Sequence, residues 1–220
     1  MRKNATVLLD DGKLHASSVV ANNAMNRERQ LTGVNSYAKE LGFDPLTRLT
    51  EPGSAWLDLC CGSGRALTQA AARRADVTLV GVDLVAPPAT TGVRFVEAPV
   101  GDWTPDRAFD LITCVHGLHY IGDKLGVLTR VLKWLTPTGT FVADLDLASV
   151  RAENARGLPA LLRAADIGYD TRRRRITCTG PRDLRLPFRY LGADDKAGPN
   201  YTGQPAVNSY YENGLTLPII

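Results

Sequence analysis

Short apolar runs alternate with amphipathic segments through the middle of the chain. The apolar runs lie at 55–59, 77–82, 93–97, 109–115 and 140–145, and amphipathic segments lie at 66–74 and 123–135. Short apolar runs bounded by turn residues are typical of buried strands, whereas apolar residues three or four apart are typical of helices. Because the two kinds of segment alternate, the pattern predicts an α/β fold, with a doubly wound parallel sheet and right-handed crossovers.

The segment before this core predicts a short arm followed by helices. Alternating apolar positions around Asp10-Asp11-Gly12 predict a hairpin turn. From Asn22 to Leu41 the pattern predicts a helical segment that Gly33 interrupts, and Gly42 is a candidate for its C-cap. We therefore expect an N-terminal arm and a helical lid.

The segment after the core predicts a helix and two strands. The helix is expected over 153–165, where Pro159 either kinks it or delays its start. Strands are expected at 171–178 and 184–191, joined as a C-terminal antiparallel hairpin at the end of the sheet. Together with the core strands they predict a Rossmann-like, mostly parallel seven-stranded sheet. We expect a single domain made of an arm and lid at 1–52, a core at 53–150, and a helix, hairpin and tail at 151–220.

Composition supports one domain and narrows the function classes. The chain has 220 residues, 44% of them hydrophobic, and a net charge of +3, which is too small to indicate nucleic-acid binding by itself. No apolar run approaches the roughly 20 residues that a membrane helix needs. Acidic residues at positions 10 and 11 come too early for a secretory signal, so we expect a cytoplasmic protein. Its four cysteines form no C-x-x-C pair and its three histidines are few, so no metal site is expected.

The stretch from Trp56 to Arg65 predicts a strand, a turn of small residues and the start of a helix, which lets backbone N–H groups approach a ligand closely. The usual dinucleotide fingerprint needs a third glycine, and Leu67 stands at that position. Asp58 precedes the turn, where its carboxylate would order the turn or meet a cationic ligand group through water. Asp83 ends the next strand, where a bidentate acceptor meets a ribose diol. The sequence thus predicts a ribose-containing ligand without a diphosphate.

Five stretches, in order, resemble one known family. The stretch from Leu57 to Gly64 resembles motif I of class I S-adenosylmethionine-dependent methyltransferases, in the variant with cysteine for the first glycine. Val80–Asp83 resembles the family's second acidic strand, Gly101–Trp103 the loop that meets adenine, and Phe109–Cys114 the fourth strand. Leu135–Phe141 resembles its L-x-P-G-G-x-hydrophobic turn, with Thr138 replacing a glycine. The resemblance covers about residues 55 to 145.

The resemblance implies a set of cofactor contacts for S-adenosylmethionine and its product S-adenosylhomocysteine. Asp83 would bind the ribose hydroxyls with Leu84 against adenine, and in the adenine loop, which begins at Gly101, Asp102 would accept from the adenine N6 amine. The remaining implied contacts are Cys60, Gly62 and Gly64 under the methionine part, Trp103 over the adenine ring, and Cys114 and His116 near the methionine or ribose.

The resemblance also points to a catalytic candidate and a lid. His119 lies where the family often places substrate-facing residues, and it could accept a proton from the acceptor; the alternative is a structural histidine beneath the cofactor. Tyr120 is interpreted as a packing residue. In related enzymes an N-terminal helical segment closes over the cofactor, which points to Tyr37 first, and then to Arg29 or Arg27 as the cation that meets the carboxylate.

The run from Arg172 to Arg175 raises the question of RNA binding. In a strand, alternate side chains face opposite ways, so only half of the run would form one patch, and no aromatic platform accompanies it. We interpret the run as a solvated edge strand.

The sequence thus predicts a methyltransferase that acts on a small-molecule acceptor through O, N or C, in a setting such as secondary metabolism. The expected form is a monomer or homodimer with no nucleic-acid partner. Two alternatives stay open: a methyltransferase acting on RNA or protein, and a protein that binds S-adenosylmethionine without transferring methyl.

Overall fold

The computed structural model describes residues 7–21 and 29–214. Part of the helical segment expected from Asn22 to Leu41, including Arg27, lies outside the described residues. In the part that the structure describes, no helix is both long and apolar enough to cross a membrane.

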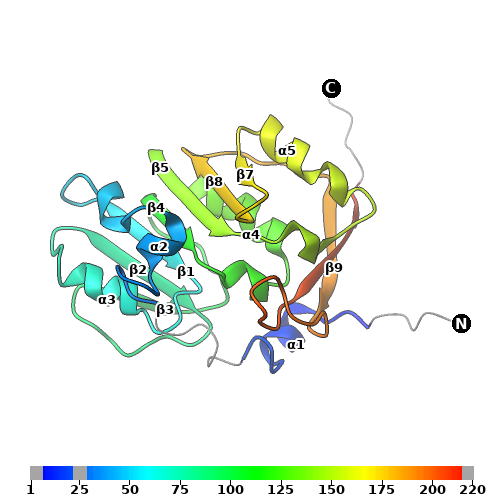
Figure 1. The fold of residues 1–220 in the computed structure, drawn as a ribbon, viewed down its shortest axis with the longest axis horizontal. Coiled ribbons are helices and arrows are strands. Elements are labelled where there is room, and N and C mark those ends of the chain that lie inside the picture. Colours follow the sequence, from blue (N-terminus) through cyan, green and yellow to red (C-terminus); the bar gives the residue numbers. More distant parts are fainter. Residues whose placement is uncertain (1–6, 22–28, 215–220) are drawn as a thin grey trace, which may run out of the picture.

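A seven-stranded sheet forms the centre of the molecule, with the strand order β3-β2-β1-β4-β5-β8-β7 (Figure 1). Its strands are β1 (Ala55–Leu59), β2 (Thr78–Asp83), β3 (Arg94–Glu97), β4 (Phe109–Cys114), β5 (Leu135–Asp144), β7 (Gly168–Asp170) and β8 (Arg175–Thr179). Strands β1 to β5 are parallel, whereas β8 runs antiparallel to both of its neighbours. This is the predicted doubly wound, mostly parallel sheet with a C-terminal antiparallel hairpin, which is therefore confirmed.

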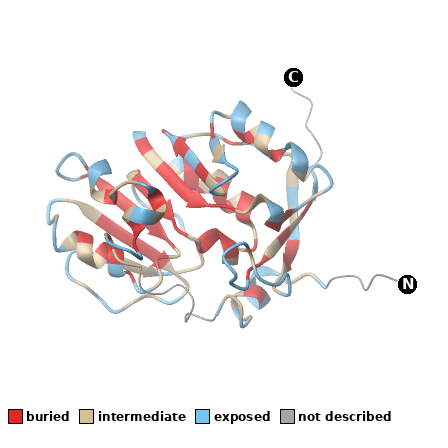
Figure 2. Ribbon diagram, in the orientation of Figure 1, coloured by how far each residue is buried: buried red, intermediate tan, exposed pale blue. Residues whose placement is uncertain are grey.

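Helices cover both faces of the sheet. The apolar residues of α4 (Lys124–Val131) and α5 (Leu158–Ala164) pack in one core cluster, and those of α2 (Tyr37–Leu41) and α3 (Arg65–Ala71) pack in the other. Every residue of β1 is buried between these layers, as the buried colouring of the central strands shows (Figure 2). Short 3-10 turns lie at Pro45–Arg48, Gly117–Tyr120, Leu132–Trp134, Leu147–Ser149 and Ala155–Gly157.

The N-terminal hairpin prediction is wrong, because the segment forms the helix α1 (Asp11–His15). Asp10 caps this helix by accepting from the Lys13 backbone N–H at 2.9 Å, which satisfies a donor that a hairpin turn would leave exposed. Leu14 on α1 is fully buried in a small cluster with Ala193 and Val207. The chain before α1 also pairs with β9 (Phe188–Asp194), so these segments from the two ends of the sequence lie side by side (Figure 1).

The pairing expected for the C-terminal strands is wrong. The hairpin joins β7 to β8, and residues 171–174 form its turn, in which one carboxylate oxygen of Asp170 accepts from two backbone N–H groups. Chain 184–191 leaves the main sheet, and β9 (Phe188–Asp194) pairs instead with β10 (Asn208–Asn213), which also pairs with β6 (Val150–Arg151). Alternation of apolar and polar residues indicates a strand, but it does not determine which other strand that strand pairs with.

The expected helix over 153–165 begins later, at α5, with Pro159 in its first turn, so the delayed start is confirmed. The arginine run is not an edge strand, because three of its residues lie in the turn and Arg175 lies in β8, which pairs on both sides. Arg175 contacts the Asp144 carboxylate at 3.2 Å, and Arg174 lies over the Tyr201 ring at 4.2 Å. These arginines are engaged inside the fold.

Candidate functional site

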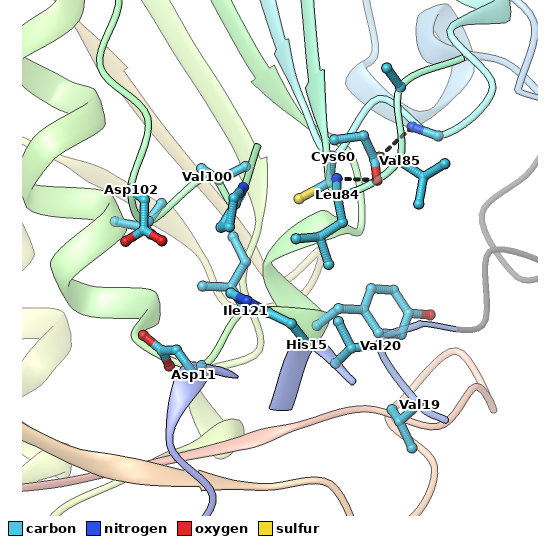
Figure 3. Close-up of a pocket in the computed structure, with 18 of the residues that line it drawn as sticks. Asp11, His15, Val19, Val20, Cys60, Leu84, Val85, Val100, Asp102 and Ile121 are labelled. Carbon is cyan, nitrogen blue, oxygen red and sulfur yellow. Dashed lines mark hydrogen bonds between the residues drawn. The ribbon is translucent and has the colours of Figure 1, made fainter. Parts of the chain in front are cut away.

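A cavity of about 460 Å³ opens where the carboxyl ends of the parallel strands meet (Figure 3). Its lining comes from the turn after β1, from residues 83–88 after β2, from residues 99–102 after β3 and from residues 120–123 after β4. The strand order reverses between β1 and β4. Open α/β sheets bind their ligands at such a switch point.

The turn after β1 is fixed by Asp83. One Asp83 carboxylate oxygen accepts from the Gly62 backbone N–H at 2.8 Å, and the other accepts from the Leu84 backbone N–H at 2.8 Å. Burial raises the pKa of Asp83, while these backbone donors act in the opposite direction. A third backbone N–H, that of Val85, acts on the same carboxylate, which lines the cavity and has about four acceptor positions, so it keeps capacity to accept from a hydroxyl there.

Gly64 is required by close packing. Its φ of +65° is left-handed, and a Cβ there would lie 2.3 Å from the Phe95 ring.

We expect Gly64→Ala to destabilise the fold by about 2–4 kcal/mol, from strain and overpacking together, in urea melts. Gly157→Ala is the matched control, because Gly157 has no left-handed φ and a Cβ there meets nothing within 4 Å. Equal stability of the two variants would contradict this account of the turn.

Asp58 lies behind the turn rather than in the cavity wall, and it is 1% exposed. Its two carboxylate oxygens accept from Tyr37 Oη at 2.7 Å and Thr113 Oγ1 at 2.6 Å. Thr113 Oγ1 in turn accepts from Trp56 Nε1 at 2.8 Å. Burial chiefly raises the pKa of Asp58 to about 7, and the charge on Asp83 adds to that rise. Asp58 therefore links β1 to Tyr37 of α2 and Thr113 of β4 behind the cavity wall.

Tyr37→Phe tests this buried chain of hydroxyls. The folded pKa of Asp58, about 7, exceeds its ordinary value of 3.8, so the folded protein holds an extra proton between those values and loses stability as the pH rises through them. Tyr37 favours the charged carboxylate, so its loss matters most once Asp58 is ionised. We expect a destabilisation of about 1–3 kcal/mol at pH 8 and a smaller one at pH 5, measured by urea unfolding.

The control for this variant is Tyr169→Phe. It removes a phenol oxygen that donates to the neutral Leu145 carbonyl at 2.9 Å. Its destabilisation should be the same at pH 5 and pH 8. A pH-independent effect of Tyr37→Phe would refute the assignment of the titrating partner.

The structure brings six of the expected cofactor residues into the cavity wall and leaves others outside. Those in the wall are Cys60, Gly62, Asp83, Leu84, Gly101 and Asp102. Trp103 is not in the wall: its ring packs edge-on against Trp134, with ring centroids 5.7 Å apart. Cys114 is fully buried next to Cys60, since a Cβ on Gly117 would lie within 3 Å of both sulfur atoms.

Arg29 and His116 meet in a charged cluster outside the cavity wall. Arg29 Nε lies 3.8 Å from one Glu40 oxygen, and His116 Nε2 lies 3.6 Å from the other. His116 Nδ1 also lies 3.8 Å from Asp144, which Arg175 contacts. The side chains of both predicted residues are therefore held by protein carboxylates in this structure.

His119 also lies outside the cavity wall. It is 2% exposed, and its ring stands edge-on to Tyr201, with ring centroids 5.4 Å apart. Burial chiefly lowers the pKa of His119 to about 3, with the nearby charges of His116 and Lys124 acting in the same direction. A lowered pKa makes the imidazole a weak base, and His119 is not part of the cavity wall, so both observations favour the structural interpretation over the role of base.

Sequence reasoning missed the outer wall of the cavity. That wall contains Asp11 and His15 on α1, then Val19 and Val20, opposite Cys60, Leu84 and Val85 (Figure 3). Tyr120, interpreted as a packing residue, also lines the cavity. The sequence does contain one indication of this helix. Asp10 is a residue type that caps helices, and Asp11 and His15 are four residues apart, which places them on one helix face. Among the described residues no cluster of metal ligands occurs.

Residues 34–192 match the model of a family described as "Methyltransferase domain". Among curated proteins the chain is similar to trans-aconitate 2-methyltransferases. It is 29% identical over 107 residues to that of Acidovorax sp. (strain JS42), covering 46% of this chain and 42% of the relative. The match to that of Methylobacterium radiotolerans is 31% over 96 residues, covering 40% and 36%. The matched region thus spans less than half the length of these relatives.

Solved structures with a similar arrangement include two methyltransferases. The plantazolicin methyltransferase BpumL, in complex with a pentazolic desmethylPZN analog and SAH, gives a TM-score of 0.43 at 12% identity, covering 69% of this chain and 60% of that one. The phospholethanolamine N-methyltransferase 2 of Haemonchus contortus gives a TM-score of 0.39 at 20% identity, covering 50% and 28%.

Proposed function

Because the chain belongs to the methyltransferase domain family, we propose that its cavity binds S-adenosylmethionine and that the protein transfers the methyl group to a small-molecule acceptor. The observation that carries this proposal is Asp83, whose carboxylate the Gly62 and Leu84 backbone N–H groups hold at the cavity wall. A carboxylate fixed in this way suits a ribose diol. S-adenosylmethionine would supply an electrophilic methyl group on a sulfonium sulfur.

The residues of the wall fit the rest of this molecule. Leu84 and Val100 offer apolar surface for a flat ring, and Asp102 offers an acceptor for an exocyclic amine. Cys60 and Gly62 form the tight turn against which a thioether chain can lie, with left-handed φ values of 55° and 57°. Catalysis then consists mainly of holding the acceptor in line with the methyl group and excluding water.

Two of the four arginines at 172–175 are engaged by protein carboxylates, while Arg172 and Arg173 are exposed, and this halved patch favours a small acceptor over RNA. Arg174 and Arg175 contact Asp146 and Asp144 at 3.4 and 3.2 Å, so their charges are already partly compensated within the protein. RNA binding requires cations that are available to phosphates. The acceptor atom, whether O, N or C, is left to the assay.

Calorimetry tests cofactor binding, and a methyl-release assay tests transfer. We expect saturable binding of S-adenosylmethionine and S-adenosylhomocysteine. We expect no binding of NAD, because the turn lacks the third glycine of the fingerprint that binds a dinucleotide diphosphate. Product formation would then be followed with labelled S-adenosylmethionine over small-molecule acceptors that include trans-aconitate. Absence of cofactor binding would overturn the proposal, and binding without any transfer would favour a non-catalytic binding protein.

A further inference from the structure

Among the residues that the structure describes, the cavity wall contains four carboxylates and neither lysine nor arginine. Its four acidic residues are Asp11, Asp83, Asp102 and Asp123, all within the described part of the chain. Asp83 and Asp102 serve the adenosine part of the cofactor in the proposed function. Asp11 and Asp123 lie near each other in the remaining wall, and the cofactor contacts proposed above leave both without a ligand.

Packing brings these two carboxylates together around Gly122. A Cβ on Gly122 would lie 2.5 Å from an Asp11 carboxylate oxygen, so only glycine allows the α1 helix to approach here. Burial chiefly raises the pKa of Asp123; the charge on Asp11 adds to the rise, and the charge on Lys124 opposes it. The fold therefore keeps two carboxylates close together at this part of the wall.

Each carboxylate is oriented by a tyrosine. Tyr190 Oη donates to Asp11 Oδ1 at 3.1 Å, and Tyr211 Oη donates to Asp123 Oδ1 at 3.1 Å. The two tyrosine rings pack on each other with centroids 5.6 Å apart. Asp123 also has a structural role. Its carboxylate accepts from the Gly126 backbone N–H at 2.9 Å and so caps α4. Neutral donors hold both groups in place, so their negative charge is oriented but not cancelled.

The nearby lysines make their direct contacts elsewhere, although the Lys124 charge also acts on Asp123 from a distance. Lys13 contacts Asp10 at 3.1 Å, on the exposed side of α1. The Lys124 ammonium instead donates to the carbonyls of Ile121 and Val207 and to Ser209 Oγ, at 2.8–2.9 Å. Within residues 7–21 and 29–214 no salt bridge to Asp11 or Asp123 occurs.

The wall beside the pair is apolar. Val19 and Val20 follow α1, and Ile121 and Val127 come from the other side of the cavity (Figure 3 labels the first three). His15 stands one helical turn after Asp11 and lines the same cavity. A ligand that fits this wall combines an apolar body with a positive charge.

On the basis of the proposed methyl transfer, we propose that the acceptor is a small molecule with an ammonium group, which Asp11 and Asp123 bind while its apolar body packs on the valines and a different, nucleophilic atom of the molecule receives the methyl group. The negative potential of these carboxylates also repels acceptors that carry a carboxylate. This distinguishes the chain from the relatives named for trans-aconitate, whose name denotes an anion.

Matched probes that differ only in charge test this proposal. Tyramine and 3-(4-hydroxyphenyl)propionate share a ring, a phenol and a two-carbon arm, and they end in an ammonium and a carboxylate respectively. Hexylamine and heptanoate form an aliphatic pair, and trans-aconitate is a further anionic probe. Each is titrated by calorimetry into the protein saturated with S-adenosylhomocysteine, whose own affinity is measured first.

We expect at least one amine to bind 10-fold or more tightly than its carboxylate partner. Asp11→Asn and Asp123→Asn should each reduce that preference at least 5-fold without changing the affinity for S-adenosylhomocysteine. Asparagine keeps the oxygen that accepts from the tyrosine and, at 123, the helix cap. Asp10→Asn is the matched control, because it removes the same charge one residue outside the cavity wall and should leave the preference unchanged.

Four results would overturn the amine proposal: equal binding within both pairs, tighter binding of a carboxylate, no binding of either amine, or a preference that survives both substitutions. Failure of S-adenosylhomocysteine itself to bind would overturn the proposed function instead. The two failures are therefore distinguishable in one series of titrations.

Discussion

Asp83→Ala is expected to lower the affinity for S-adenosylhomocysteine by roughly 30- to 1000-fold, or about 2–4 kcal/mol. The substitution removes a charged acceptor for two ribose hydroxyls. It also frees the Gly62 and Leu84 backbone N–H groups, whose hydrogen bonds to Asp83, both 2.8 Å, hold the turn in place. Calorimetric titration of the variant measures the effect directly.

Asp106→Ala is the control for that experiment. Asp106 pairs with Arg94 at 3.1 Å on the surface, away from the cavity wall, so its loss should leave cofactor affinity unchanged. If Asp83→Ala binds the product as tightly as the unaltered protein, the ribose contact proposed for Asp83 is wrong. A circular dichroism spectrum of each variant separates lost binding from lost folding.

Lys124→Met is expected to destabilise the protein by about 2–4 kcal/mol in urea unfolding. Lys124 is 1% exposed, and its ammonium supplies a donor to the Ile121 and Val207 carbonyls and to the Ser209 hydroxyl. Methionine fills a similar volume but leaves these buried acceptors without their donor. Lys133→Met is the control, because that exposed lysine pairs with Asp183 at the surface and should contribute little.

The same variant should alter the pH dependence of stability. Burial lowers the pKa of Lys124 to about 7, below its ordinary value of 10.5. Between these values the unfolded chain holds a proton that the folded chain has released, so the contribution of Lys124 to stability rises with pH. Lys124→Met should flatten the rise from pH 7 to pH 9. A slope as steep as in the unaltered protein would assign the titration to another group.

The sheet could be predicted from sequence because its signal is local. Each core strand is a short apolar run, and Asp58, Gly62 and Gly64 mark the turn that follows β1. Pairing in the C-terminal part could not be predicted in the same way. Whether 184–191 joins β8 or β10 depends on packing between distant segments, to which alternation along one strand is insensitive.

The site was predictable where a residue belongs to the sheet and unpredictable where it closes the cavity from outside. Asp83, Leu84 and Asp102 follow the strands and reach the wall, as expected. Asp11 and His15 reach it only because Leu14 anchors α1 beside the C-terminal strand. The predicted base, His119, lies in the turn after β4, as expected. Its side chain is buried and does not reach the cavity wall, and residue spacing along the sequence does not reveal such burial.

The pairing of the chain before α1 with β9 has a consequence for the order of events during synthesis. Leu9 bonds to Ala193, Leu14 packs on Val207, and Lys124 reaches Ser209. The turn after β1 and the strand ending at Asp83 leave the ribosome well before those C-terminal partners do. The half of the cavity that contains Asp83 is therefore synthesised early, whereas the outer wall on α1 can reach its place only after Ala193 and Val207 have emerged.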